Sequence, residues 1–456
     1  MLRDIINKEL LENILHFKFI LSFLVCVILF STCAIIRVKD YQEQLRAYRS
    51  NVQLHHRAAT QYKSAKDLAI KGIKIDHPPN PLSILVEGVS NSYPKTMTIA
   101  LSSGFITDER AGKTALNLIF DTFDFVTLIQ IVISLIAILF TYNAISGERE
   151  DGTLTLSLSN PLPRHTLILG KMVGNFLPLI TTLLISLIAG LLIVVVMGGI
   201  EFDAHAWGRI GVIFLLSLLY LLLFSNMGIM VSVRSRSSVT SLILLLFLWV
   251  IFVFVIPHAG ILLANYLKPV PTPDHIQEQK GMIFGMQMYQ WSSKVEKYKE
   301  EHGVYPPKDV WDSREVERDL SIADGYRKVE EKFKSQVDAQ VRVAKTISRF
   351  SPSSSLYYAC SSLAGTSILN EKAYFKELEQ YRSLFVDYSL GKMKKGATWS
   401  SSGEKLDLSG IPLLQVQPFY RTPIRKDFLV DFFLLVVFNL VFFLLAYFSF
   451  LKRTFL

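Results

Sequence analysis

Six long runs of apolar residues divide the chain, and charged and polar residues return after each of them. Each run is close to the roughly 20 apolar residues that an α-helix needs to cross the hydrocarbon core of a bilayer. The pattern therefore predicts an all-α polytopic membrane protein with six transmembrane helices. The predicted spans are residues 17–36, 124–142, 172–197, 210–231, 239–257 and 427–451.

Residues 1–16 show a different pattern, in which apolar and charged positions fall on different faces of a helix. This arrangement predicts an amphipathic helix that lies at the membrane surface just before the first span. The apolar positions of this helix are Leu2, Ile5, Ile6, Leu10 and Ile14.

The first long polar segment, residues 37–123, opens with apolar and aromatic residues at steps of three and four from Tyr41 to Ala69. This spacing predicts a stalk helix that continues the first span. The prolines of "HPPNP", residues 77–81, are expected to end it, because proline interrupts a helix.

The second long polar segment, residues 258–426, is about the size of an ordinary domain. It contains three stretches with helical spacing, which predict a mainly helical domain. Serine- and glycine-rich stretches at 351–355 and 396–410 are predicted to be loops.

The distribution of lysine and arginine sets an expected orientation. Basic residues gather at both termini and in the short segments 143–171 and 233–238, whereas the short segment 198–209 on the other side holds only one. Because short cytoplasmic loops carry the excess of basic residues, both termini are predicted to be cytoplasmic. The two long segments then lie outside the cytoplasm.

Composition adds little to this picture. Charged residues make up 19% of the chain, below the quarter or so that is typical of soluble domains, and the net charge is +9. The basic residues are spread between membrane anchors and outer segments, so membrane lipids are the expected charged partner and nucleic acid is not.

Candidate chemistry within the chain is sparse. The three cysteines show neither metal-binding spacing nor a disulfide framework. The stretch at 104–114 fails as a phosphate-binding loop, because Thr107 stands where the first glycine is required. We therefore expect no catalytic residue, no metal site and no cofactor in this chain, and no ATP hydrolysis by the chain itself.

Four polar residues within the predicted spans allow two interpretations. They could line a translocation path, or they could tie neighbouring helices together by hydrogen bonds, which is the more common role of such residues. The four are Asn175, Thr181, Thr182 and Asn226.

The predicted cytoplasmic connection at 143–171 is dense in charge for a short membrane loop. Glu148, Arg149 and Glu150 follow one another, and Ser146 is placed to cap a helix whose first turn favours acidic side chains. We interpret it as a short rigid helix fixed to spanning helices at both ends, which a docking protein could tilt as a lever. The alternative is a helix that only seals the bilayer surface.

The stretch "SGEREDGTLTLSLSNPLPRHTLILGK" resembles the segment that follows the second span in permeases of ABC-2 type ATP-binding-cassette exporters. Six spans and an amphipathic N-terminal helix fit the same family. The resemblance implies a coupling helix that docks on a separate ATPase subunit. The residues that it assigns to this helix are Glu148, Arg149, Glu150, Gly152 and Thr153.

The resemblance also implies roles for other parts of the chain. Residues 1–16 would form the connector helix, and the loop 233–238, with Arg234 and Arg236, would make a second contact to the ATPase. The implied partners are two ABC ATPase subunits, which bind ATP and Mg, and a second permease chain in a homo- or heterodimer. The stretch "RFSPSSSLYYACSSLAGT" resembles a bacterial subgroup related to gliding-motility and copper-site-maturation transporters, which implies a bacterial inner membrane.

Two hypotheses of function follow. The first is the permease subunit of an ATP-driven exporter. The second is a mechanotransmission complex that carries no substrate and instead drives an extracytoplasmic partner protein, because loops as long as 258–426 are usually functional. A sensor that works without an ATPase is a third and weaker alternative.

Overall fold

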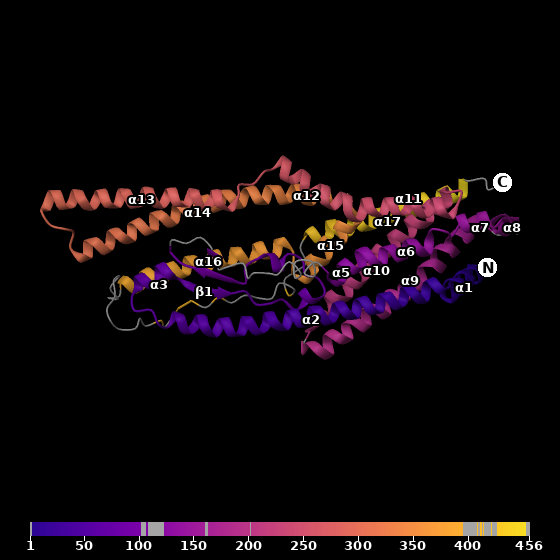
Figure 1. Cartoon of the computed structure of the whole chain (residues 1–456), viewed down its shortest axis with the longest axis horizontal. Coiled ribbons are helices and arrows are strands. Elements are labelled where there is room, and N and C mark those ends of the chain that lie inside the picture. The colour runs from indigo at the N-terminus through magenta and orange to yellow at the C-terminus, as the bar shows by residue number, and fades with distance from the viewer. Residues whose placement is uncertain are drawn as a thin grey trace.

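The structure is a computed structural model of an elongated molecule (Figure 1). The N- and C-terminal ends lie together at one end, here called the terminal end, and a helical arm and a small lobe form the other end. The described residues are 2–101, 106–107, 123–159, 163–200, 202–394, 408, 411–412, 414, 421 and 426–452.

Six helices are long and apolar enough to cross a membrane, which confirms the predicted fold class. Four of them are unbroken, and two contain a π-helical turn. The unbroken helices are α2 (Phe17–Ala59), α9 (Arg164–Gly198), α10 (Ala204–Arg234) and α17 (Lys426–Lys452). The interrupted helices are α5 (Phe125–Leu128), η3 (Ile129–Ile133) and α6 (Ser134–Thr141), and α11 (Ser238–Val250), η4 (Ile251–Val255) and α12 (Ile256–Leu267).

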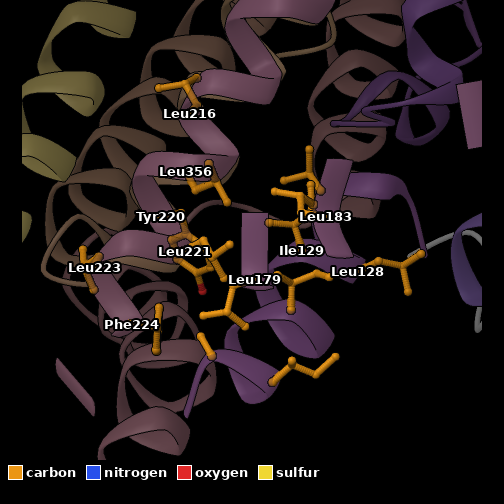
Figure 2. Close-up of a cluster of buried hydrophobic side chains, with 14 of the residues drawn as sticks. Leu128, Ile129, Leu179, Leu183, Leu216, Tyr220, Leu221, Leu223, Phe224 and Leu356 are labelled. Atoms are coloured by element: carbon orange, nitrogen blue, oxygen red, sulfur yellow. The ribbon is translucent and has the colours of Figure 1, made fainter. Parts of the chain in front are cut away.

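Helix α10 forms the centre of the bundle, and its apolar side chains are buried in several directions, as expected for a helix enclosed by others. Gly228 allows α6 to come close, because a Cβ atom there would fall 1.8 Å from the hydroxyl oxygen of Thr141. Figure 2 shows part of the core, in which α10 meets α9, η3 and a further helix, α15 (Pro352–Ala364). The labelled side chains include Leu179, Leu183, Leu216, Tyr220, Leu221, Phe224, Ile129 and Leu356.

The first span continues without a break away from the terminal end, as its spacing predicted, and α2 is 43 residues long. The prediction that residues 77–81 end this helix is wrong. The helix ends at Ala59, and Ser64 then caps a separate short helix, α3 (Ala65–Lys71), by accepting a hydrogen bond from the backbone N–H of Asp67. A serine cap, and not a proline, therefore fixes where the next element begins.

The lobe is formed by α3, the strands that follow it and residues 368–394. It contains a small antiparallel sheet that was not predicted from the sequence. Gly72, with a φ of 68°, allows the sharp turn from α3 into the first strand. In the sheet order β1-β2-β3, Ile73 pairs with Ile99. The elements are β1 (Ile73–Asp76), β2 (Thr96–Ile99) and β3 (Ile106–Thr107), with short 3₁₀ turns η1 (Pro81–Ile84) and η2 (Ser90–Ser92).

The lobe has its own small core. Aromatic residues of α16 (Ile368–Lys394), among them Tyr374 and Phe385, pack with Leu68 of α3 and with Ile99 of β2. One of the stretches with helical spacing in the second long polar segment is therefore a helix with a packed apolar face.

The arm is a long helical hairpin that runs away from the terminal end (Figure 1). Its two helices are α13 (Pro273–His302) and α14 (Lys308–Ser348). Ion pairs join α14 to α16, with Lys334 2.8 Å from Glu379. The arm and the lobe are therefore held side by side.

The stretch 351–355 was predicted to be a loop, and this prediction is wrong. Ser351 is the N-cap of α15, its side chain accepts hydrogen bonds from the backbone of Ser353 and Ser354, and Pro352 occupies the first turn. Proline and serine are favoured at these helix positions. The predicted loop at 396–410 lies, apart from Leu408, outside the described residues.

Helix α15 is built into the bundle. Gln130 of η3 donates a hydrogen bond to the Ser353 carbonyl at 2.7 Å, and Ser351 donates one to the Phe252 carbonyl of η4. Beside it, Arg349 forms two hydrogen bonds, 2.6 and 3.1 Å long, with Asp431 of α17. The Asp431 side chain is buried against this arginine, although the residue lies near one end of the last apolar run.

Candidate coupling site

The segment that follows α6 at the terminal end folds into two short helices. They are α7 (Ser146–Glu150) and α8 (Thr153–Ser159), and Gly152 lies between them with a φ of 72°. Ser146 was predicted to cap the first helix, but its hydroxyl instead donates to the Tyr142 carbonyl at 2.9 Å. The predicted single helix is therefore a pair of helices with a glycine turn between them.

A buried lysine joins three helices at this point. The ammonium of Lys171, on α9, lies 2.7 Å from Glu9 of α1 (Leu2–Leu15) and 2.9 Å from Glu148 of α7. The Lys171 side chain is only 2% exposed. Buried charges are tolerated in proteins when they are paired and hydrogen-bonded, and here both carboxylates are supplied. This Lys171 cluster therefore ties α1, α7 and α9 together.

Gly174 brings α1 close enough for this contact. A Cβ atom at Gly174 would lie 2.5 Å from the Cβ atom of Glu9, so a larger residue would push α1 away. Asn175, one position further on, lies 3.3 Å from the other carboxylate oxygen of Glu9 and accepts a hydrogen bond from Asn13.

Two more residues of α7 connect to the corner between α10 and α11. The guanidinium of Arg149 donates to the carbonyls of Ser235 and Val233 at 2.5 and 3.2 Å. A cation is favoured at the C-terminal end of a helix, where carbonyl groups lack partners within the helix. Glu150 accepts a hydrogen bond from Ser238 at 2.5 Å. Through α7, the corner between α10 and α11 is thus linked to the Lys171 cluster.

The structure divides the predicted coupling residues into two groups. Glu148, Arg149 and Glu150 are engaged with other helices of this chain. Gly152 and Thr153 are exposed at the turn between α7 and α8.

Arg234 and Arg236, which the sequence placed in a second contact to an ATPase, are both exposed at the same end. Arg234 also donates a hydrogen bond to the Ser449 hydroxyl of α17 at 3.1 Å.

Helix α8 presents an apolar side chain that was not predicted to take part in the coupling contact. Leu156 is 71% exposed, whereas Leu154 is buried and holds α8 against the bundle. The alternation of leucines in the sequence was the signal for this pair, but it did not show which leucine faces outward.

The family comparison settles what kind of protein presents this arrangement. A family model described as "ABC-2 family transporter protein" matches residues 3–455. The chain belongs to the ABC-2 transporter family. The match covers nearly the whole chain and confirms the resemblance that the segment at 146–171 indicated.

Two curated relatives of this ABC-2 family protein carry the same printed name, "Probable ABC transporter permease protein NosY". The relative from Stutzerimonas stutzeri is 42% identical over 82 residues, which is 18% of this chain and 30% of the relative. The relative from Pseudomonas aeruginosa is 47% identical over 60 residues, or 13% of this chain and 22% of the relative. The chain therefore spans less than a third of the length of either relative.

The four polar residues considered for a translocation path bond to their own or neighbouring helices in this ABC-2 family protein. Thr181 and Thr182 donate to the Pro178 carbonyl at 2.8 and 2.9 Å, and Asn226 contacts Asn439 of α17 at 3.5 Å. Asn175 belongs to the surroundings of the Lys171 cluster. The contacts of Asn175 and Asn226 are of the helix-tying kind, and a role in translocation stays a prediction.

The described residues of this ABC-2 family protein do not bring three histidine, cysteine, aspartate or glutamate side chains together around a possible metal ion. The expectation that this chain binds no metal and no cofactor of its own stays a prediction.

Proposed function

We propose that this chain is the permease subunit of an ATP-driven exporter and that the terminal end faces the cytoplasm of a bacterial inner-membrane system. Two ABC ATPase subunits would bind ATP and Mg and dock on the terminal end, and a second permease chain would complete the pair. Family membership and the Lys171 cluster support the proposal, because this cluster links the surface helices to the spanning helix α9.

In the proposed mechanism, the exposed and internal residues of α7 and α8 have different tasks. Leu156 and Thr153, which are exposed, would contact the ATPase. Glu148 and Arg149 would pass the resulting displacement to α1, α9 and α10, because their partners lie on those helices. A rigid contact of this kind can bias the arrangement of packed helices as a unit.

The proposal is tested by separating docking from coupling. The Leu156→Asp variant places a charge in the proposed contact and is expected to lose co-purification of the ATPase. A matched control is Val304→Asp, which makes the same change at an exposed position of the arm. Retention of the ATPase by Leu156→Asp would refute the proposed docking surface.

The Arg149→Ala variant is expected to behave differently. It keeps the exposed surface of α8, so the ATPase should still co-purify, but stimulation of ATP hydrolysis by the permease should fall. If the stimulation is unchanged, Arg149 does not transmit the displacement.

A second candidate function is mechanotransmission to an extracytoplasmic partner protein, and α15 favours it. This helix is buried among α10, α17 and the two π-helical turns, and it is continuous in sequence with the arm helix α14. A displacement of the bundle would therefore reach the arm through a packed element.

Shortening the arm distinguishes the two functions. Ile283 of α13 lies against Gly325 of α14, so deleting residues 284–324 would join two positions that are already neighbours. An exporter whose two permease chains stay paired through their spanning helices is expected to retain substrate flux and ATPase stimulation after this deletion. A mechanotransmission complex is expected to lose its partner protein while ATP hydrolysis continues.

A further inference from the structure

Helix α13 of the arm uses one of its faces to pack on α14. Lys280 lies 2.5 Å from Glu330, and the rings of Trp291 and Trp311 meet edge to face with 5.1 Å between their centroids. This face has its partner within the hairpin.

The opposite face of α13 is apolar and exposed. Met282, Met286 and Tyr289 stand at steps of four and three, and they are 59%, 54% and 76% exposed. Within the described part of the chain, a Cβ atom added at Gly281 or Gly285 would meet nothing within 4 Å. The face therefore has no partner among the described residues.

Lipid is not a suitable cover for this face. Helices α11 and α12 with their π-turn contain 30 residues, about 45 Å of helix, which already exceeds the roughly 30 Å of a bilayer core. Helix α13 follows beyond α12 and runs away from the terminal end (Figure 1). Contiguous exposed apolar surface in water is characteristic of sites of protein association.

The charge pattern favours a second copy of the chain as the cover. Residues 281–293 contain no charged residue, although charged residues flank them on both sides. A two-fold axis along the arm sets identical faces against each other, so a charge near the axis would meet its own copy. Two exposed glycines four residues apart also allow two helices to approach closely.

The same edge of the molecule stays apolar and exposed along α11, which is part of the least buried of the six apolar helices, Ser238–Leu267. Val239, Ile243 and Phe247 are exposed at steps of four. In Figure 1, α11, α12 and α13 lie along one edge of the molecule. A second chain placed against this edge would lie beside both α11 and α13.

We propose that α13 packs against α13 of a second copy through the face formed by Met282, Gly285, Met286 and Tyr289, so that two arms pair along a two-fold axis. The inference rests on the proposed function only in taking two permease chains per complex. It adds that the two chains are identical and that the arms hold them together outside the membrane-spanning part.

Disulfide cross-linking of the full chain in native membranes tests the pairing. The native cysteines Cys26, Cys33 and Cys360 are buried, so they give little background. Under mild oxidation, Met282→Cys and Tyr289→Cys are expected to give a band at about twice 51.7 kDa. The control is a cysteine at Lys328 of α14, whose side chain is 71% exposed, and it should remain monomeric.

A second variant keeps the test independent of where the cysteine lies. Gly285→Leu places a large side chain where glycine leaves open space on the proposed contact face. Leucine favours a helix more than glycine does, so α13 should still fold. In the Met282→Cys background it is expected to lower the cross-linked fraction about tenfold.

Three results would overturn the pairing. The cysteine variants could cross-link no more than the Lys328 control, Gly285→Leu could leave the band unchanged, or the main adduct could have the mass of a different protein. Co-purification of the ATPase is measured on the same membranes. The pairing can therefore fail while the proposed permease function stands, and the reverse outcome is equally visible.

Discussion

Replacing Lys171 by methionine removes the cation of the Lys171 cluster while keeping most of the volume of the side chain. Glu9 and Glu148 would then face each other without the charge that lies 2.7 and 2.9 Å from them. Removing one partner of a buried ion pair typically costs about 3–5 kcal/mol, because the remaining charge stays buried without compensation. We expect the free energy of unfolding to fall by this amount, and the packing to be disturbed mainly where α1 meets α7 and α9.

The magnitude can be translated into a thermal shift. Unfolding entropy is about 2 cal/mol/K per residue, so a chain of 456 residues unfolds with about 1 kcal/mol/K, and the loss corresponds to a fall in Tm of about 3–5 °C. The assay is thermal unfolding of the purified full chain in lipid nanodiscs. The control is Lys8→Met, because Lys8 is exposed and 3.6 Å from Glu148, and exposed pairs contribute about 0–1 kcal/mol.

A rescue variant shows whether charge is the cause. Adding Glu9→Gln and Glu148→Gln to Lys171→Met removes the two uncompensated carboxylates and should restore most of the lost Tm. The reasoning is refuted if Lys171→Met unfolds at the same temperature as Lys8→Met. It is also refuted if neutralising both glutamates deepens the loss.

Three further outcomes are expected. In the lobe, burial raises the pKa of Glu371 to about 7 and lowers the pKa of His77 to about 4, so the two groups, 3.6 Å apart, are both mainly neutral at slightly acidic pH and do not form an ion pair. The Glu371 contribution to stability falls as pH rises from about 4.5 to 7, whereas the His77 contribution falls as pH drops from about 6.5 to 4, so the two trends oppose each other. In the Glu371→Gln variant only the His77 trend remains, so its free energy of unfolding should fall by up to about 3 kcal/mol as the pH drops from about 6.5 to 4, while that of the wild type changes little. A Tm of the variant that does not change over this pH range would contradict this. Asp431→Asn leaves the guanidinium of Arg349 without its carboxylate and should cost about 3 kcal/mol, measured as Tm against the exposed control Asp324→Asn; an equal effect of the two variants would argue against the buried pair. Gly228→Leu should prevent α6 and α10 from packing and give little folded protein by size-exclusion chromatography, and normal yields would show that α10 can shift.

The membrane architecture could be predicted from sequence because hydrophobic length is a local property. Each of the six apolar helices is visible in a window of about 20 residues, and apart from Asp124, which caps α5, the predicted runs lie within the helices. The continuation of the first span into a stalk was also local. The end of that helix was missed because the cap at Ser64 was overlooked in favour of the more conspicuous prolines at 77–81.

The orientation of the coupling residues could not be predicted in the same way. The motif identified Glu148 and Arg149, but their partners lie elsewhere in the chain. Lys171 of α9 pairs with Glu148, and the carbonyls of Val233 and Ser235 at the end of α10 accept from Arg149. A one-dimensional pattern does not show which charged residue faces a neighbouring helix. Prediction of these contacts requires the packing of α1, α7 and α9.

Helix α15 illustrates a second limit. Its first turn reads as a loop because serine and proline are common in loops, yet the same residues are favoured at the start of a helix. The N-terminal end of this helix is stabilised by two polar groups of the bundle, the Gln130 side chain and the Phe252 carbonyl. These two groups belong to η3 and η4, which are far away in sequence and reach α15 only through the packing of the spanning helices.

The uninterrupted length of α2 has a geometric consequence. At 1.5 Å per residue, its 43 residues make a rod about 64 Å long that joins the terminal end to the lobe. If the rod stays straight, a tilt of about 5° at one end displaces the other by about 6 Å, a distance comparable to one turn of helix. Small angular changes beside the first span would then produce movements at the lobe that are comparable in size to a side chain.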